Sequence, residues 1–357
     1  MKPVKRIAIM LGAAVAIGAA GLVLRALIAG GTFTRVTPGF AGTCRTLSGV
    51  VGAEDIEIDP MDRLVFLSVS DRRASSTKPS STDGIYTLPL DRPDRGFTRL
   101  AGVPAAFHPH GISLFRAADG SLTLMAVNHL SPGHSAVDIF DVPVADGKAT
   151  LNEIGDIRSD KLISPNDVAA VGKERFYVTN DHGSRTKLGV TLENYLLLPR
   201  ADVLYFDGSV FTEAAQGLVF ANGIALSPDG AHVYVAETTA RRVRTFGRDM
   251  FSGRLMPENT LALPSGPDNI DVDERGDLWI AGHPKLFAVV AYASDPSAPS
   301  PSQILHARVA GGIPQEAIAV YTDLGGNIGA ASVGAVAKNR LFIGSIFDAK
   351  ILDCRLP

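Results

Sequence analysis

The sequence predicts an all-β protein, a six-bladed β-propeller with an N-terminal transmembrane helix. Three observations lead to this fold class: an apolar N-terminal segment, a motif that recurs six times, and short strand-like runs separated by turns. All-β propellers of this size fold as one unit, so a chain of 357 residues does not require two domains. We expect an anchor over residues 1–31 and one propeller domain over residues 32–357.

The N-terminal segment has the pattern of a membrane anchor. Lys2, Lys5 and Arg6 precede an uncharged stretch, Ile7 to Leu24, that is long enough to span a bilayer. The positive flank keeps the N-terminus in the cytoplasm while the remainder crosses. A cleaved signal peptide is the alternative, because small residues near Ala19 and Ala20 would permit cleavage. In either case the folded domain lies outside the cytoplasm, in a periplasmic or extracellular location.

A short motif recurs six times and indicates propeller blades. Each copy opens with a pair of polar or small residues followed by Ile or Val, and after a turn leads to a run rich in Val, Phe, Tyr and Leu. The second residues of the pairs lie 56, 56, 56, 46 and 63 residues apart, a period typical of blades. A large β-sandwich with strands alike by chance is the alternative, which six copies disfavour. The copies are Glu54-Asp55-Ile56, His110-Gly111-Ile112, Asn166-Asp167-Val168, Asn222-Gly223-Ile224, Asp268-Asn269-Ile270 and Ala331-Ser332-Val333.

The motif openings supply oxygen ligands for a metal. In a propeller the innermost strands surround a central channel, so these side chains should converge at one end of the axis. Carboxylate and amide oxygens without thiolate suit calcium better than zinc or copper. Each such residue is also typical of a strand-end turn, but their equivalent repeat positions favour a metal site. The candidate ligands are Glu54, Asp55, Asn166, Asp167, Asn222, Asp268 and Asn269.

Three of the histidines stand out by position. His110 opens the second motif, and His129 and His283 end strand-like runs. A neutral imidazole near a polarised carbonyl can take a proton from water. We expect His110 and His129 to be catalytic and His283 to lie in the substrate pocket. The remaining histidines are interpreted as ordinary polar residues: His108, His134, His182, His232 and His306.

Two further segments have open interpretations. Cys44 and Cys354 are the only cysteines, and an oxidising compartment favours a disulfide that would fasten the first blade to the last; two unrelated buried thiols are the alternative. Residues 185–205 carry leucines near helical spacing and predict an amphipathic helix over one face. That helix either packs on the propeller or contacts a membrane or covers the site as a lid.

Several classes of function are excluded by composition and motifs. The net charge of -3 arises from scattered charges of both signs, so nucleic acid is not an expected partner. The sequence has no Gly-x-Ser-x-Gly elbow and no His-Glu-x-x-His motif, which disfavours a serine hydrolase or zinc protease. The glycine-rich stretch 325–334 lacks the ending of a nucleotide-binding loop and is interpreted as a blade entry loop.

Taken in order, these motifs resemble those of the serum paraoxonase and arylesterase family over residues 40–357. The resemblance rests on eight stretches and is specific as an ordered set. They are Ala53-Glu54-Asp55-Ile56-Glu57, Pro109-His110-Gly111-Ile112-Ser113, Val127-Asn128-His129, Pro165-Asn166-Asp167-Val168, Thr179-Asn180-Asp181-His182, Ala221-Asn222-Gly223-Ile224, Pro267-Asp268-Asn269-Ile270 and Gly282-His283-Pro284.

The resemblance implies two calcium ions in the tunnel, one catalytic and one structural. By position, the catalytic ion would be held by Glu54, Asn166, Asn222, Asp268 and Asn269. The structural ion would be held by Asp55, Asp167 and the backbone carbonyl of Ile112. The resemblance further implies that His110 activates water and His129 orients it, that Cys44 pairs with Cys354, and that the hydrophobic N-terminus is retained.

Some features depart from the family pattern. The stretch Arg72 to Asp83 differs from the family's active-site loop, Gly183 follows Asn-Asp-His in place of an aromatic residue, and Gly282 replaces a free cysteine. These departures leave the expected metal ligands intact. They concern the substrate range, because loops over a tunnel mouth shape the pocket.

The sequence therefore predicts a calcium-dependent hydrolase of lactones and aryl esters, with a small-molecule ester or lactone as substrate and the membrane as the partner of the anchor. A sugar lactonase of the gluconolactonase type with one metal is an alternative; it predicts neither the histidine pair nor the terminal cysteines. A calcium-stabilised propeller that binds a partner at the membrane without catalysis is another. A pocket beside His110 discriminates between an enzyme and this third reading.

Overall fold

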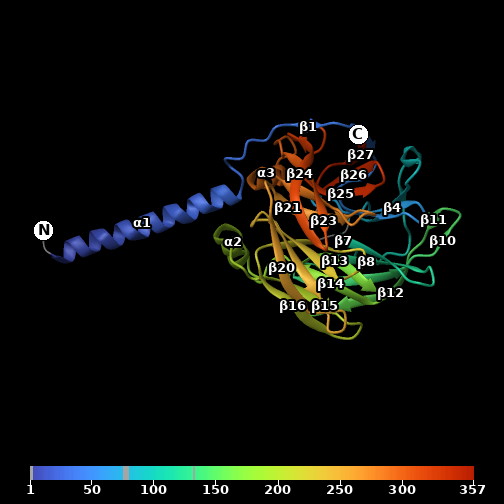
Figure 1. The fold of residues 1–357 in the computed structure, drawn as a ribbon, viewed down its shortest axis with the longest axis horizontal. Helices are drawn as coiled ribbons and strands as arrows, with labels where there is room; N and C mark the ends of the chain where they lie inside the picture. The colour runs from blue at the N-terminus through green and yellow to red at the C-terminus, as the bar shows by residue number, and fades with distance from the viewer. Residues whose placement is uncertain (1–2, 75–79, 132) are drawn as a thin grey trace.

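The computed structural model describes residues 3–74, 80–131 and 133–357, and it confirms the six-bladed propeller (Figure 1). Helix α1 (Pro3–Ala29) projects away from a ring of antiparallel sheets. Each inner strand contacts the inner strands of the two neighbouring blades, so that the ring is closed. The six motifs open the six inner strands, as the repeat predicted.

The blades follow one another in chain order, each running from an inner to an outer strand. Blades 1 to 3 comprise β3 (Ala53–Asp59), β4 (Leu64–Val69), β5 (Gly84–Pro89) and β6 (Thr98–Arg99); β7 (Pro109–Arg116), β8 (Leu122–Ser131), β9 (His134–Asp141) and β12 (Asn152–Arg158); and β13 (Pro165–Gly172), β14 (Arg175–Asn180), β15 (Ala201–Phe206) and β16 (Phe211–Leu218). A 3-10 turn, η1 (Pro93–Arg95), precedes β6, and a small hairpin of β10 (Val144–Ala145) and β11 (Lys148–Ala149) separates β9 from β12.

Blades 4 to 6 complete the ring. They comprise β17 (Ala221–Leu226), β18 (His232–Glu237), β19 (Arg242–Arg248) and β20 (Leu255–Ala262); β21 (Gly266–Val272), β22 (Leu278–His283), β23 (Ser302–Ala310), β24 (Ile313–Asp323) and, at the edge, β1 (Gly39–Phe40); and β25 (Ala331–Ala337), β26 (Arg340–Ser345), β27 (Lys350–Arg355) and β2 (Thr43–Ser48).

The hydrophobic core consists of six clusters, each lying between two adjacent blades. In β4, Val65 and Leu67 pack toward blade 6, whereas Leu64 and Phe66 pack toward blade 2. Both faces of each central strand are therefore buried, which explains why these runs read as continuously apolar and do not alternate with polar residues. This inter-blade packing excludes the β-sandwich alternative.

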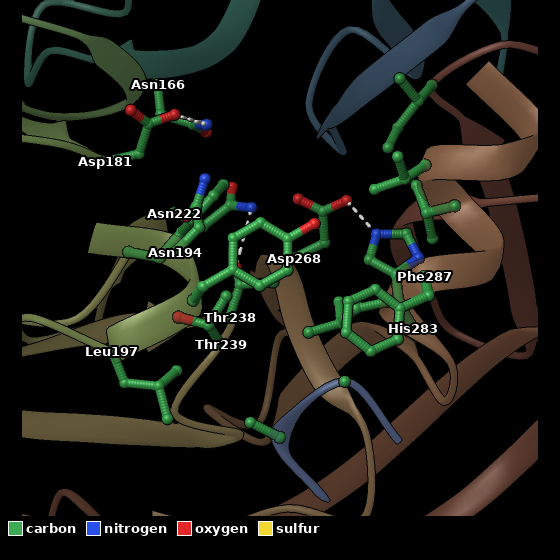
Figure 2. Close-up of a pocket in the computed structure, with 18 of the residues that line it drawn as sticks. Asn166, Asp181, Asn194, Leu197, Asn222, Thr238, Thr239, Asp268, His283 and Phe287 are labelled. Atoms are coloured by element: carbon green, nitrogen blue, oxygen red, sulfur yellow. Dashed lines mark hydrogen bonds and ion pairs between the residues drawn. The ribbon is translucent and has the colours of Figure 1, made fainter. Parts of the chain in front are cut away.

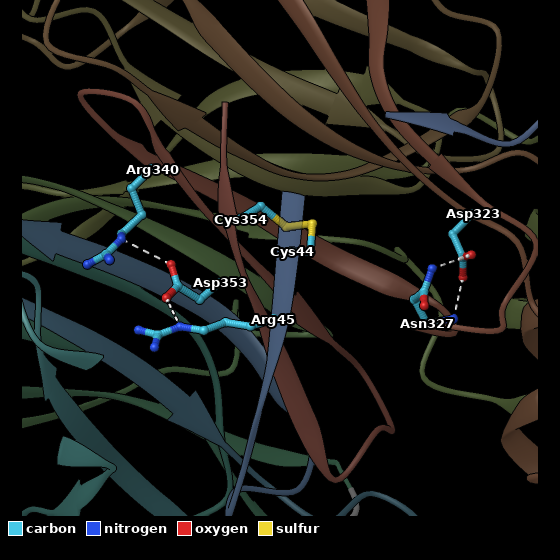
Figure 3. Close-up of a disulfide and its surroundings, with 7 residues drawn as sticks. All are labelled: Cys44, Arg45, Asp323, Asn327, Arg340, Asp353 and Cys354. Carbon is cyan, nitrogen blue, oxygen red and sulfur yellow. Dashed lines mark hydrogen bonds and ion pairs between the residues drawn. A yellow bond between two sulfur atoms is a disulfide. The ribbon is translucent and has the colours of Figure 1, made fainter. Parts of the chain in front are cut away.

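The N-terminal strands close the ring, and this corrects one prediction. The bridge between Cys44 and Cys354 forms, but it joins β2 to β27 inside blade 6 and does not link the first blade to the last (Figure 3). The expectation was wrong because the chain first lays β2 along the outer edge of the last blade and only then enters blade 1. Asp353 lies beside the bridge and pairs with Arg45 at 2.7 Å and Arg340 at 3.0 Å.

Three helices lie at the same side of the ring (Figure 1). In α1, the segment Met10–Ala29 is long and apolar enough to cross a membrane. Helix α2 (Lys187–Leu196) falls inside the predicted segment, and Thr186 caps it by accepting a hydrogen bond from Gly189 N. Helix α3 (Leu286–Ser294), which the sequence analysis missed, starts where Leu286 N donates to the carbonyl of Gly30.

Helix α2 packs on the propeller through its polar residues. Glu193 is buried and accepts a hydrogen bond from Gly183 N at 3.0 Å, while Asn194 contacts His182 at 3.0 Å. Leu188 remains exposed, and the half-exposed ring of Tyr195 stacks on Phe287 of α3 with 6.3 Å between the ring centroids. The packing alternative for this helix is therefore observed, while a membrane contact or a lid role stays a prediction.

Candidate active site

A β-bulge at the start of every inner strand directs the motif residues into the tunnel. The register between the first two strands shifts at this point in all six blades, for example between Ala53 and Asp55 and between Pro165 and Val168. A bulge leaves residues without a ladder partner and turns their side chains. The motif residues consequently separate into two layers: Glu54, Asn166, Asn222 and Asp268 line an upper cavity, whereas Asp55 and Asp167 line a lower one. Asn269, although second in its motif, donates to Glu54 and so belongs to the upper layer.

The upper layer presents oxygen atoms that no group of the described residues satisfies. Within the part of the chain that the structure describes, four buried side-chain oxygens have no hydrogen-bond partner: Glu54 Oε2, Asn166 Oδ1, Asn222 Oδ1 and Asn269 Oδ1. A buried acceptor without a partner costs about 1–3 kcal/mol, so four in one place are destabilising unless an ion or bound water satisfies them. These are four of the five residues predicted to hold the catalytic calcium.

The side-chain nitrogens of the three asparagines donate hydrogen bonds, which explains why the oxygens stay free. Asn166 Nδ2 donates to Asp181 at 3.2 Å, Asn222 Nδ2 donates to Thr238 at 3.1 Å, and Asn269 Nδ2 donates to Glu54 Oε1 at 3.0 Å. Each nitrogen is thus engaged while the oxygen of the same amide stays free; Figure 2 marks the contact of Asn166 with Asp181 as a dashed line. The fifth predicted ligand, Asp268, is 3% exposed and accepts a hydrogen bond at 2.7 Å from His283 Nε2.

A cavity of about 390 Å³ opens beside these groups. Its polar wall contains Glu54, His110, Asn166, Asn222 and Asp268. The remaining wall is largely apolar and comes from the three helices and the neighbouring loops. This part comprises Ala26, Ala29, Leu197, Phe220, Leu286, Phe287, Val289, Val290 and Ile346.

The lower layer differs because each oxygen of its carboxylates accepts a hydrogen bond from a backbone amide. Asp55 accepts from Ile56 N and Ile112 N, each at 2.8 Å, and Asp167 accepts from Val168 N and Ile224 N, each at 2.7 Å. Each carboxylate thus joins its own blade to the next one. Ile112 takes part through its amide, and the calcium ligation by its carbonyl stays a prediction.

The same joint recurs in blade 5, where Asp271 accepts from Val336 N of blade 6 at 2.8 Å. Three alternate blades therefore each extend a carboxylate to the following blade. Asp271 was not predicted as a site residue, although it directly follows the motif Asp268-Asn269-Ile270. The signal that could have found it is an acidic residue in the inner strand of a blade.

Two glycines make room for this arrangement. A Cβ atom at Gly111 would lie 2.1 Å from Asp167 Oδ1 and 2.5 Å from its Cα atom. A Cβ atom at Gly223 would lie 2.5 Å from the Asp268 carbonyl oxygen. The alternation of polar pairs with pairs that contain glycine is thus a consequence of close packing between neighbouring blades around the axis.

The electrostatics of both layers favour a bound cation. Burial raises the pKa of Glu54 well above its ordinary value, and it raises the pKa of Asp55 to about 7. Burial also raises the pKa of Asp167, and the nearby Asp55 carboxylate adds to this effect. Hard oxygen donors in such an environment match calcium, which neutralises the charge that burial penalises. The residues present therefore fit the ion.

His110 and His129 form the pair that the sequence predicted. His110 Nδ1 and His129 Nε2 are 2.9 Å apart, and His129 Nδ1 lies 3.2 Å from Ser135 Oγ. His110 Nε2 lies 3.7 Å from Glu54 Oε1. Burial lowers the pKa of His110 well below its ordinary value and lowers the pKa of His129 to about 4. Both imidazoles are neutral at neutral pH, which is the state a general base requires.

Two residues near the site were missed, and one repeat position would have found them. In blades 2 to 5, the residue that follows the ladder partner of the residue before the motif lies at the cavity or beside it: His129, Asp181, Thr238 and His283. Only the two histidines were singled out from the sequence. His182, interpreted as an ordinary residue, contacts Asp181 at 2.6 Å and so supports the same wall.

Comparison with known proteins identifies the family. A family model described as arylesterase matches residues 40–356. The chain belongs to the arylesterase family. Serum paraoxonase/arylesterase 1 of Mus musculus is 32% identical over 333 residues, which cover 91% of this chain and 92% of that protein. Serum paraoxonase/arylesterase 1 of Homo sapiens is 34% identical over 324 residues, 88% of each chain, and the human paralogue serum paraoxonase/arylesterase 2 is 31% identical over 326 residues, 88% of each chain.

Solved structures support the fold of this arylesterase-family protein. A luciferin-regenerating enzyme has a TM-score of 0.55 at 14% identity, with 88% of this chain and 95% of that chain covered. A gluconolactonase from Xanthomonas campestris has a TM-score of 0.55 at 19% identity, with 90% and 94% covered. At this level of identity the likeness concerns the propeller alone.

Proposed function

We propose that the protein is a calcium-dependent hydrolase of lactones and aryl esters. The membrane segment, residues 1–31, anchors it, and the hydrolase domain, residues 32–357, lies outside the cytoplasm. The observation that carries the proposal is the group of unsatisfied buried oxygens beside His110 at the wall of an apolar cavity. The relatives are named for paraoxonase and arylesterase activity, and their family depends on calcium in general.

Two calcium ions are proposed, one for each layer. Glu54, Asn166, Asn222, Asp268 and Asn269 would hold the catalytic ion, which supplies polarisation of the substrate carbonyl and stabilisation of the oxyanion. Asp55, Asp167 and the Ile112 carbonyl would hold the structural ion. The amides that already bind Asp55 and Asp167 leave lone pairs on each carboxylate oxygen for a metal.

The histidine pair performs the proton transfer in this proposal. His110 Nε2 points toward Glu54 and accepts a proton from a water molecule that attacks the carbonyl carbon. His129 holds the His110 ring through Nδ1, and Ser135 in turn holds His129, so that the base keeps one orientation. His283 holds Asp268 in the wall of the cavity. The ester bond breaks to give a carboxylate and an alcohol without a covalent enzyme intermediate.

Hydrolysis by the full chain in detergent micelles, measured on a panel of lactones and aryl esters with calcium and with a chelator, tests the proposal. Calcium should be required for every substrate. Asp268→Ala should lower kcat/KM by about 10³-fold because it removes an anionic metal ligand, and His110→Gln should lower it by about 10²-fold or more. The exposed residue Glu274, changed to Ala, is the matched control. Undiminished lactone hydrolysis after complete calcium removal would contradict the proposal.

The apolar cavity separates this function from a non-catalytic propeller. A protein that used calcium for stability alone would need no hollow of about 390 Å³ beside a buried histidine pair. The pair and the Cys44–Cys354 bridge also separate it from the sugar lactonase alternative, which requires neither.

A further inference from the structure

Arg72 lies at the rim of the cavity, in the stretch where the sequence departs from the family pattern. Its guanidinium donates to three main-chain carbonyls: Gly52 O at 3.4 Å, Ser70 O at 3.3 Å and Pro109 O at 3.1 Å. Gly52 stands two residues before Glu54, and Pro109 stands directly before His110. The guanidinium is therefore fixed between the two strand starts that carry the proposed metal ligand and the proposed base.

The rest of this stretch is held in place independently. Asp83 accepts hydrogen bonds from Asp71 N at 3.0 Å and Ser80 N at 3.1 Å, and it pairs with His108 at 2.7 Å. Arg73 lies over the ring of Tyr292 at 4.4 Å and over the ring of Phe347 at 4.7 Å. Residues 75–79 lie outside the described residues, but both flanks of Arg72 are fastened to the propeller.

Arg72 has no carboxylate partner at ion-pair distance among the residues that the structure describes. Its hydrogen bonds all end on neutral carbonyls, and two of its five N–H groups, Nε–H and one on Nη2, have no acceptor within the described part of the chain. A buried or half-buried cation without an anionic partner is costly. Its charge nevertheless reaches the site, since Arg72 lowers the pKa values of Glu54, His110 and His129, although burial is the largest influence on each of them.

The charges that line the cavity leave Arg72 available for a ligand. The cavity wall contains three carboxylates, Glu54, Asp181 and Asp268, and one arginine. One calcium ion neutralises Glu54 and Asp268, and Asp181 is engaged with His182 at 2.6 Å. Arg72 is then the remaining cation at the cavity wall.

We propose that Arg72 is a specificity-determining residue that holds a carboxylate of the substrate. The preferred substrates are then lactones or esters that carry a carboxylate close to the ester linkage, with the remaining body apolar. The planar fork of a guanidinium matches a carboxylate, and its two free N–H groups supply the hydrogen bonds. This inference rests on the proposed hydrolase function and names its substrate class.

The test compares two lactones that differ in one charge. One is γ-butyrolactone with a carboxylate on the ring carbon bonded to the ring oxygen, and the other carries a primary carboxamide there. The calcium-loaded full chain in detergent should prefer the carboxylate by at least tenfold in kcat/KM, mainly through KM. In Arg72→Gln the preference should fall to about one, in Arg72→Lys part of it should remain, and in the exposed control Arg254→Gln it should equal that of the wild type.

A binding measurement keeps the inference independent of turnover. Calorimetry with tetrahydrofuran-2-carboxylate and the corresponding carboxamide, neither of which can be hydrolysed at the ring, should show tighter binding of the carboxylate to the wild type. Arg72→Gln should weaken that binding about tenfold and leave calcium retention against a chelator intact or stronger, because a like charge is removed.

Two results would overturn the role of Arg72: equal activity of the wild type on the two lactones, or a carboxylate preference that survives in Arg72→Gln. The second result would assign the carboxylate to the metal. If the wild type hydrolyses neither lactone nor any member of the wider panel, the proposed function fails, and the calorimetric comparison then decides the role of Arg72 by itself.

Discussion

The two layers of the tunnel use similar residues in opposite ways. In the upper layer, Glu54, Asn166, Asn222 and Asn269 keep an oxygen without a partner, whereas in the lower layer Asp55 and Asp167 bind two backbone amides each. The upper residues therefore offer free acceptors to a bound ion, while the lower carboxylates already connect neighbouring blades. Motif residues of one chemical kind thus divide into a candidate site for chemistry and a joint for stability.

The largest expected effect on stability comes from replacing one residue of each layer with alanine. Asp167→Ala leaves the amides of Val168 and Ile224 without their acceptor. It should destabilise the calcium-loaded protein by about 2–4 kcal/mol, with part of the loss remaining after chelation. Asn222→Ala should lower stability mainly when calcium is present, because its buried oxygen has no partner among the described residues and its nitrogen donates only to Thr238. Guanidinium unfolding, followed by the fluorescence of Trp279, the single tryptophan, measures both.

The control for this pair is Asp160→Ala, since Asp160 is exposed. Equal losses for Asp167→Ala and Asn222→Ala at every calcium concentration would erase the distinction between the layers. A loss for Asp167→Ala that disappears completely on chelation would assign its whole contribution to metal binding.

A smaller effect is expected from adding one methyl group between the blades. Gly111→Ala would press Cβ against Asp167 and should cost about 1–3 kcal/mol, together with weaker calcium retention in a chelator competition. Gly39→Ala is the matched control, because no atom lies within 4 Å of the added Cβ there. Unchanged stability and calcium retention in Gly111→Ala would show that the blades can separate at this point without cost.

The smallest expected effect concerns the pH dependence of activity. Since burial lowers the pKa of His110 and brings that of His129 to about 4, both imidazoles stay neutral as the pH falls below 6.5. At saturating calcium, kcat/KM at pH 5.5 should retain most of its value at pH 7.5. An unshifted base with a pKa near 6.5 would leave roughly a tenth of the kcat/KM measured at pH 7.5. An acid limb at or above pH 6.5 in the pH–rate profile would remove His110 as a buried base.

Much of the site was predictable because the propeller repeats itself in sequence. The six motif openings marked Glu54, Asn166, Asn222 and Asp268, and the strand ends marked His129 and His283. Asp181 and Thr238 occupy the same strand-end position but were passed over, since an Asp or Thr at a turn is common while a histidine is conspicuous. Arg72 was noticed only as a departure, because no repeat position predicts where a long side chain after β4 will lie.

The sequence by itself determined the number of blades, the apolar N-terminal segment and the chemistry of the tunnel, since these depend on local hydrophobic patterns and on residue types that recur with one period. Tertiary structure decided the rest. The bulges separated Asp55 from Glu54 into different layers, hydrogen bonds from the amides of Asn166 and Asn222 turned their oxygens inward, and the N-terminal strands completed the last blades. Each of these depends on contacts between residues of different blades, so no single repeat contains the information. The proposed calcium ligands are therefore predictable from the repeats, but their arrangement forms only when the ring closes.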